Sequence, residues 1–166
     1  MQTHVIQVDG GSKVTLNRTG FEMSAASPLI DCWVQSYDGK HPLLDIGRAF
    51  GRNTEAAVRK IHSSMGTPKT TTPQVVAVDC DDRHLQAVDA LKLTGVKTLF
   101  GRLPGDFPSK EAIGGSSSGI LISAVLHFLK GEDIESSIQS AHNLLVSGSK
   151  LVLSTVSFNF KPAIWQ

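Results

Sequence analysis

The chain has 166 residues, 40% of them hydrophobic and 19% charged, and a formal net charge of +1. A chain of this length buries roughly 70% of its extended surface and normally forms one domain. The near balance of charges leaves no positive excess to attract phosphates, so nucleic acid is not expected as a partner. No apolar run approaches the ~20 residues of a membrane span, and residues 1–15 lack the pattern of a secretory signal, so we expect a cytoplasmic protein without membrane contact.

Cysteine and histidine usage argues against disulfide and metal chemistry. Cys32 and Cys80 are too few for a disulfide framework and have no CxxC spacing, so we expect two free thiols. The six histidines are scattered and form no HxH or HxxxH pair that would grip a metal ion. We therefore predict no metal site.

The first part of the chain is predicted to be separate from the rest. Residues 1–23 are expected to form an N-terminal hairpin or arm, because His4–Val8 and Lys13–Leu16 flank the turn-forming stretch Asp9–Ser12. Residues 24–166 are expected to form the main domain. Its first helix is predicted to begin at Ser27–Pro28, with the serine as N-cap and the proline in the first helical position. Trp33 of this helix is expected to pack beneath a sheet.

From residue 43 onward, short apolar runs alternate with helical patterns. The expected strands are Leu43–Ile46, Val75–Val78, Val96–Phe100, Gly119–Ser123 and Lys150–Val156. The expected helices run from Asn53 or Thr54 to about Met65, from Asp82 to Leu93 and from Glu132 to Val146. The stretch Gly101–Ser118, rich in proline, glycine and serine, is expected to be loop or poorly formed helix. This alternation predicts right-handed crossovers and hence a doubly wound α/β domain with a mainly parallel sheet and helices on both faces.

The most informative segment runs from Leu43 to Thr54, where an expected strand ends in a small-residue turn that opens onto a helix. Gly47 and Gly51 allow the backbone to turn sharply and approach a ligand, and the N–H groups of the following helix favour a negative group. A dinucleotide is one candidate, but a GxGxxG turn needs a small residue where Arg52 stands. A nicotinamide-dependent oxidoreductase is disfavoured for this reason and because the chain has no Tyr-x-x-x-Lys pair.

The same turn, Asp45–Gly51, resembles motif I of class I S-adenosylmethionine-dependent methyltransferases, which reads DxGxGxG, with Ala49 in place of the middle glycine. In that family the turn wraps the methionine part of the cofactor, and the acidic residue helps to orient its amino group. The resemblance thus implies cofactor contacts for Asp45, Gly47, Arg48, Ala49, Phe50 and Gly51. Structural alternatives are that Asp45 caps the following helix or pairs with Arg48, and that Arg48 and Arg52 are ordinary exposed charges.

Asp79 closes the second expected strand and takes the place of the family's ribose-binding acid. A carboxylate offers two acceptor oxygens to the two neighbouring ribose hydroxyls. Cys80, the next residue, is assigned to the adenine pocket, and a small buried hydrophobic residue is the alternative reading. Asp81 and Asp82 are expected to be solvated charges that favour the N-terminus of a helix.

The later motifs match the family less closely. Arg102 and Leu103 stand where the family contacts adenine, although its usual Asp or Asn is absent. Ser123 and Ala124 lie at and just after the end of the fourth strand, in the region where the family faces the reactive methyl group. Ser118 replaces an acid often found at the start of that strand. His127 is the candidate catalytic general base, and a histidine packed beside Phe128 is the alternative.

The resemblance implies S-adenosylmethionine as cofactor, methyl transfer to an unidentified acceptor, and a sheet whose strands, numbered along the chain, are ordered 3-2-1-4-5. The alternative is a noncatalytic methyltransferase-like module that binds the cofactor or a partner. The family's final antiparallel hairpin finds no room after the fifth strand, so a truncated domain is expected. Its exposed sheet edge would favour a homodimer.

Overall fold

The structure is a computed structural model that describes residues 5–7, 13–15, 26–67 and 72–155. Strands β1 (Val5–Gln7) and β2 (Lys13–Thr15) form a small antiparallel pair in which Val5 lies opposite Thr15. The expected turn between them, residues 9–12, lies outside the described residues. That residues 1–23 form a separate unit stays a prediction.

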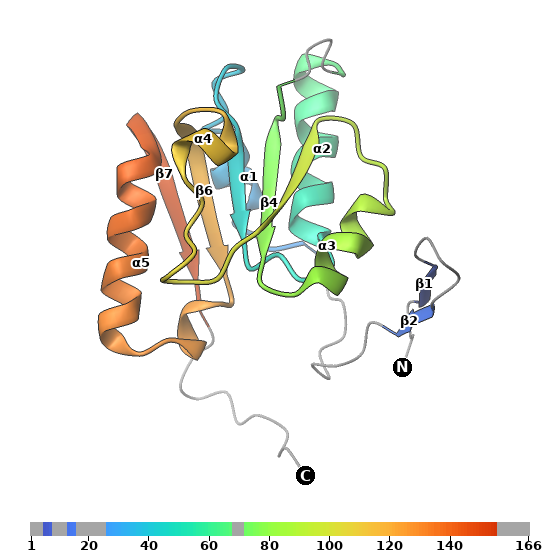
Figure 1. The fold of residues 1–166 in the computed structure, drawn as a ribbon. Coiled ribbons are helices and arrows are strands. Elements are labelled where there is room, and N and C mark those ends of the chain that lie inside the picture. Colours follow the sequence, from blue (N-terminus) through green and yellow to red (C-terminus); the bar gives the residue numbers. More distant parts are fainter. Residues whose placement is uncertain (1–4, 8–12, 16–25, 68–71, 156–166) are drawn as a thin grey trace.

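The main sheet has five parallel strands, and their order confirms the predicted fold class. The strands are β3 (Leu43–Ile46), β4 (Val75–Asp79), β5 (Val96–Phe100), β6 (Ser117–Ser123) and β7 (Leu145–Ser154). They lie in the order β5-β4-β3-β6-β7, which is 3-2-1-4-5 along the chain (Figure 1). Strands β4 and β5 are added on one side of β3, and β6 and β7 are added on its other side, so the strand order reverses between β3 and β6. In doubly wound folds, ligands bind at the carboxyl ends of the strands at such a point.

Helices cover both faces of this sheet. On one face lie α1 (Ile30–Val34) and α2 (Arg52–Met65), and on the other lie α4 (Lys110–Ile113), the 3₁₀ turn η1 (Leu126–Phe128) and α5 (Gly131–Leu144). Helix α3 (Asp82–Asp89) packs on β4 and β5. Across residues 26–67 and 72–155, no helix combines the length and apolar character required to cross a bilayer.

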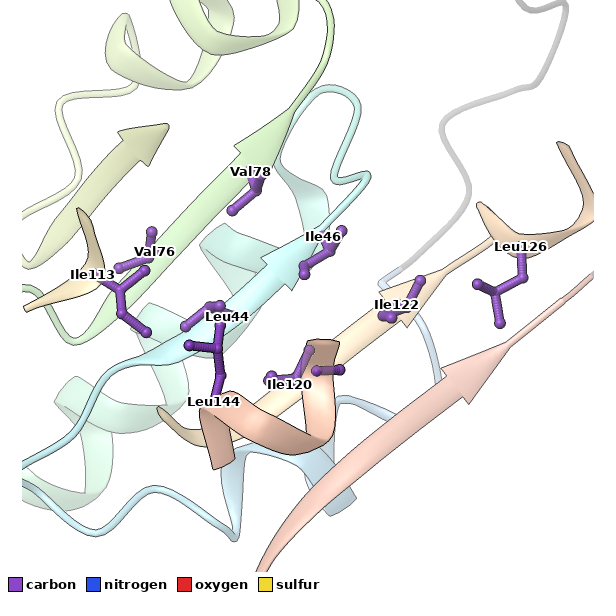
Figure 2. Close-up of a cluster of buried hydrophobic side chains, with 10 residues drawn as sticks. Leu44, Ile46, Val76, Val78, Ile113, Ile120, Ile122, Leu126 and Leu144 are labelled. Carbon is purple, nitrogen blue, oxygen red and sulfur yellow. The ribbon is translucent and has the colours of Figure 1, made fainter. Parts of the chain in front are cut away.

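Alternation along the central strands builds two apolar cores. Leu43 and Val75 face α1 and α2, where Trp33 is fully buried as predicted. The intervening residues face the other way, and Figure 2 shows Leu44, Val76 and Ile120 converging with Leu144 of α5. Strands β3, β4 and β6 are buried at every position, as expected for parallel strands covered on both faces. The sheet is therefore a well-packed platform for loops at its carboxyl edge.

Several predicted element bounds are wrong in detail. Helix α3 ends at Asp89 rather than Leu93. The short helix α4 lies within residues 101–118, which were expected to be loop or poorly formed helix. The largest difference concerns residues 145–149, because β7 begins at Leu145, directly after α5, where a helix to Val146 and a strand from Lys150 were expected. The pairing of β7 with β6 shifts register near Gly148, which has a left-handed conformation (φ +83°), and it continues on both sides of this irregularity.

Candidate functional site

The turn between β3 and α2 has an unusual backbone that fixes its residue types. Gly47, Ala49 and Gly51 all have positive φ, at +72°, +46° and +79°. A Cβ atom on Gly47 would lie 1.9 Å from Cγ2 of Val125, and one on Gly51 would lie 2.2 Å from Cγ2 of Val88. Both glycines are thus required by conformation and by space, because the turn lies against the segment after β6 and against α3.

Asp79 stands at the carboxyl end of β4 and is hydrogen-bonded to this turn. The N–H of Ala49 donates to Oδ2 of Asp79 at 3.0 Å. Oδ1 of Asp79 accepts from the N–H of Asp81 and from Nδ1 of His84, both at 3.0 Å. The imidazole nitrogen is the donor because an ionised carboxylate only accepts. The structure therefore brings together the two elements that the sequence assigns to one site.

Asp45 lies directly beneath the turn and is fully buried. Its Oδ2 accepts a hydrogen bond from Oγ1 of Thr54 at 2.6 Å, which ties the end of β3 to the first turn of α2, while its Oδ1 has no described partner. Desolvation raises the pKa of Asp45 to about 6, against the opposing effects of the Thr54 hydrogen bond and the nearby Arg48 cation. Asp45 is thus a buried acid with one acceptor oxygen still open.

Arg48 does not behave as an exposed charge, so that alternative reading is wrong. Only 2% of the residue is exposed, and none of its three guanidinium nitrogens has a described hydrogen-bond partner. The turn folds back so that Nη1 lies 3.7 Å from the position of a Cβ on Gly51. Burial lowers the pKa of Arg48, and the carboxylates of Asp79 and Asp45 oppose that shift. Arg48 therefore balances the two acids of the site from within the protein.

A ring contact joins the turn to α3. The rings of Phe50 and His84 meet edge to face, with centroids 4.7 Å apart and planes at 80°. Both residues are half-buried. The sequence assigns no role to His84, and its only signal is its position in the first turn of the helix that follows Asp79. His84 thus contacts both Asp79 and a predicted cofactor residue.

The segment after β6 borders the same edge of the sheet. Ser123 is buried, and its Oγ lies 2.9 Å from Oγ of Ser154 at the end of β7. Ala124 is exposed and left-handed (φ +56°), and its N–H donates to the carbonyl of Ser154 at 2.9 Å. His127 is exposed, and its ring lies 4.0 Å from that of Phe128, which is 74% exposed. The two rings therefore contact each other without forming part of the core.

The remaining predicted site residues are placed less distinctively. Cys80 is exposed, so its reading as a small buried residue is wrong, because it lies beyond the last residue of β4. Both cysteines are free thiols, as predicted. Arg102 is exposed, and Leu103 packs partly against the core beside α4 and α5. Ser118 donates to the carbonyl of His41 at the amino end of β6, at the edge of the sheet opposite the site.

Within residues 26–67 and 72–155, no three side chains of His, Cys, Asp or Glu come together in a way that would hold a metal ion. The absence of a metal site in the whole chain stays a prediction.

Comparison with known proteins yields structural matches only. No protein-family model matches the sequence, and no curated protein matches it. SAM-bound CalS10, an amino pentose methyltransferase from Micromonospora echinaspora, is 18% identical with a TM-score of 0.56 over 79% of this chain. The glycopeptide N-methyltransferase MtfA complexed with sinefungin is 15% identical, with a TM-score of 0.56 over 79% of this chain. PKMT2 from Rickettsia typhi in complex with AdoHcy is 14% identical, with a TM-score of 0.55 over 77%.

This chain therefore has the fold of the class I S-adenosylmethionine-dependent methyltransferases, as the motif resemblance predicts. The matched regions cover 49% of CalS10, 50% of MtfA and 25% of PKMT2. The chain thus spans about half the length of the first two proteins and a quarter of the third.

Proposed function

We propose that this chain binds S-adenosylmethionine where the turn 45–51 meets Asp79 and that it transfers the methyl group to an acceptor. One observation carries the proposal: the Ala49 N–H donates to Oδ2 of Asp79 at 3.0 Å, so the two motif elements meet at the carboxyl ends of neighbouring strands. The ligands of the structural neighbours, SAM in CalS10 and sinefungin in MtfA, support the same cofactor class.

The donors and acceptors of the site fit the chemistry of that cofactor. Asp79 accepts three hydrogen bonds, and a carboxylate has about four lone-pair positions, so Oδ2 keeps one position for a ribose hydroxyl. Oδ1 of Asp45 is a buried acceptor without a described partner, and the methionine ammonium is a cationic donor. In this proposal the rest of the methionine part lies along the turn 47–51, in which Ala49 is the exposed residue.

When bound, S-adenosylmethionine supplies an activated methyl group on a sulfonium. The residues of this chain contribute alignment, which accounts for much of the acceleration in such transfers. In this proposal Cys80, Arg102 and Leu103 border the adenine, and Ser123 and Ala124 line the transfer region. His127, exposed after β6, removes a proton from the acceptor.

Isothermal titration calorimetry with S-adenosylmethionine and its demethylated product tests the binding. Asp79→Asn should weaken affinity by about 10- to 100-fold, because a charged acceptor is lost. Asp82→Asn is the matched control, since Asp82 is an exposed acid in the first turn of α3, the helix that follows Asp79. Absence of both heat and thermal shift for the unmodified protein at millimolar ligand would rule the proposal out.

A turnover assay with a panel of acceptors tests the transfer. His127→Gln should lower kcat by about 100-fold and leave cofactor affinity unchanged, with His142→Gln on α5 as the control. Cofactor binding without turnover on any acceptor would instead favour the noncatalytic module.

A further inference from the structure

The three donors that bind Asp79 differ in their freedom to move. Two are main-chain groups, the N–H of Ala49 in the turn and the N–H of Asp81. Asp81 is itself fixed as the N-cap of α3, because its side chain accepts from the N–H of Arg83. The third donor is a side chain, Nδ1 of His84. Only His84 can leave Asp79 by side-chain rotation, without a change in the main chain.

The acceptor positions on Asp79 are too few for this arrangement and a ribose diol together. Oδ1 carries two hydrogen bonds and is filled, while Oδ2 carries one and keeps one open position. A ribose with free 2′ and 3′ hydroxyls brings two donors. One of the three protein donors must therefore give up its position when both hydroxyls bind.

The surroundings of His84 allow this movement. Its side chain is 20% exposed, whereas that of Asp79 is 7% exposed, so the imidazole reaches solvent and the carboxylate hardly does. Its ring also packs edge to face with Phe50 and interacts electrostatically with the N-cap acid Asp81, and both interactions are weak compared with a charge-assisted hydrogen bond. Rotation of His84 would also release the ring of Phe50 from that contact.

We propose that His84 is a displaceable donor: it holds Oδ1 of Asp79 in the ligand-free protein and yields that position to a ribose hydroxyl. This inference rests on the proposed binding of an adenosyl ligand at Asp79. His84 is a positioning residue that acts through Asp79, and it lowers affinity for ligands with an intact diol. Ligands without the two hydroxyls leave the His84 hydrogen bond in place.

Calorimetry with two probes tests the displacement, using S-adenosylhomocysteine, which carries the diol, and 2′,3′-dideoxyadenosine, which does not. His84→Phe removes the donor and keeps a ring against Phe50, and His84→Ala removes both. Each variant should bind S-adenosylhomocysteine about tenfold more tightly, because a charge-assisted hydrogen bond no longer competes. Affinity for dideoxyadenosine should stay the same. His62→Ala is the matched control, since Nε2 of His62 pairs with Oε1 of Gln74 at 2.9 Å, before the start of β4.

Nitrogen NMR of the unmodified protein gives an independent readout that does not depend on a variant folding. The Nδ1 resonance of His84 should shift when S-adenosylhomocysteine is added and stay in place with dideoxyadenosine. An unchanged resonance would overturn the displacement, and so would equal or weaker affinity of His84→Phe for S-adenosylhomocysteine. In either case, binding that depends on Asp79 would still support the proposed function. No binding to the unmodified protein or to either variant would overturn both.

Discussion

Ala49 shows how a single residue can work against the conformation of a turn. Its φ of +46° lies in the left-handed region, which costs a residue with a Cβ roughly 1–2 kcal/mol relative to the right-handed region. The side chain is exposed, so it gains little packing in return. The hydrogen bond from the N–H of Ala49 to the side-chain carboxylate of Asp79 stabilises this strained conformation.

Ala49→Gly should therefore stabilise the protein by about 1 kcal/mol, because glycine adopts this conformation without a steric penalty. Urea denaturation followed by circular dichroism measures the change. Ala56→Gly in the middle of α2 is the control and should destabilise by a similar amount. A destabilising Ala49→Gly would contradict the strain argument.

Asp45 makes stability depend on pH at the same scale. Because burial raises the pKa of Asp45 to about 6 in the folded protein, above its ordinary value of 3.8, the folded state binds the proton more tightly than the unfolded state. Protonation of Asp45 therefore stabilises the folded state at low pH. The free energy of unfolding falls as the pH rises from about 4 to about 6, by up to about 3 kcal/mol for this group.

Asp45→Asn should remove this part of the pH dependence, because asparagine keeps a partner for Thr54 and does not titrate. The free energy of unfolding of both proteins, measured from pH 4 to pH 7, gives the comparison. The prediction fails if the difference between the two proteins is constant across that range.

At the scale of elements, the turn after β3 and the segment after β6 are packed into each other. Gly47→Ala should destabilise by at least about 2 kcal/mol, from the positive φ and from the collision with Val125. Adding Val125→Ala should recover the part due to the collision and leave the part due to φ. Denaturation of both single variants and the pair measures the coupling, and strict additivity would show that the two segments do not meet.

At the scale of the whole molecule, β7 forms an edge of the described sheet, with β6 as its neighbour. Unpaired main-chain groups on such a strand favour association with another chain. Leu153 on β7 is 39% exposed. We therefore expect a homodimer through this edge.

Sedimentation equilibrium should show this dimer, and Leu153→Lys should shift it towards monomer, because a lysine on an edge strand opposes pairing. Met65→Lys, at an exposed position at the end of α2, should leave the dimer unchanged. A monomer at all concentrations would contradict the expectation.

The amino-acid sequence by itself determined the order and type of the main elements and the location of the turn. Apolar runs such as Val75–Val78 and the glycines at positions 47 and 51 are local signals, because strand burial and left-handed turns impose residue types within a few positions. Asp45 and Asp79 were predicted from the resemblance of the first turn and of the end of the second strand to the family's motifs.

Only the tertiary structure decided which way the side chains around these acids face. Arg48 is buried rather than solvated, Cys80 is exposed rather than packed, and His84 reaches back from α3 to Asp79. These outcomes depend on how α2, α3 and the segment after β6 pack around the turn. Spacing along the chain carries little information about such contacts, because they form between side chains of separate elements and are fixed only when the whole sheet and its helices come together.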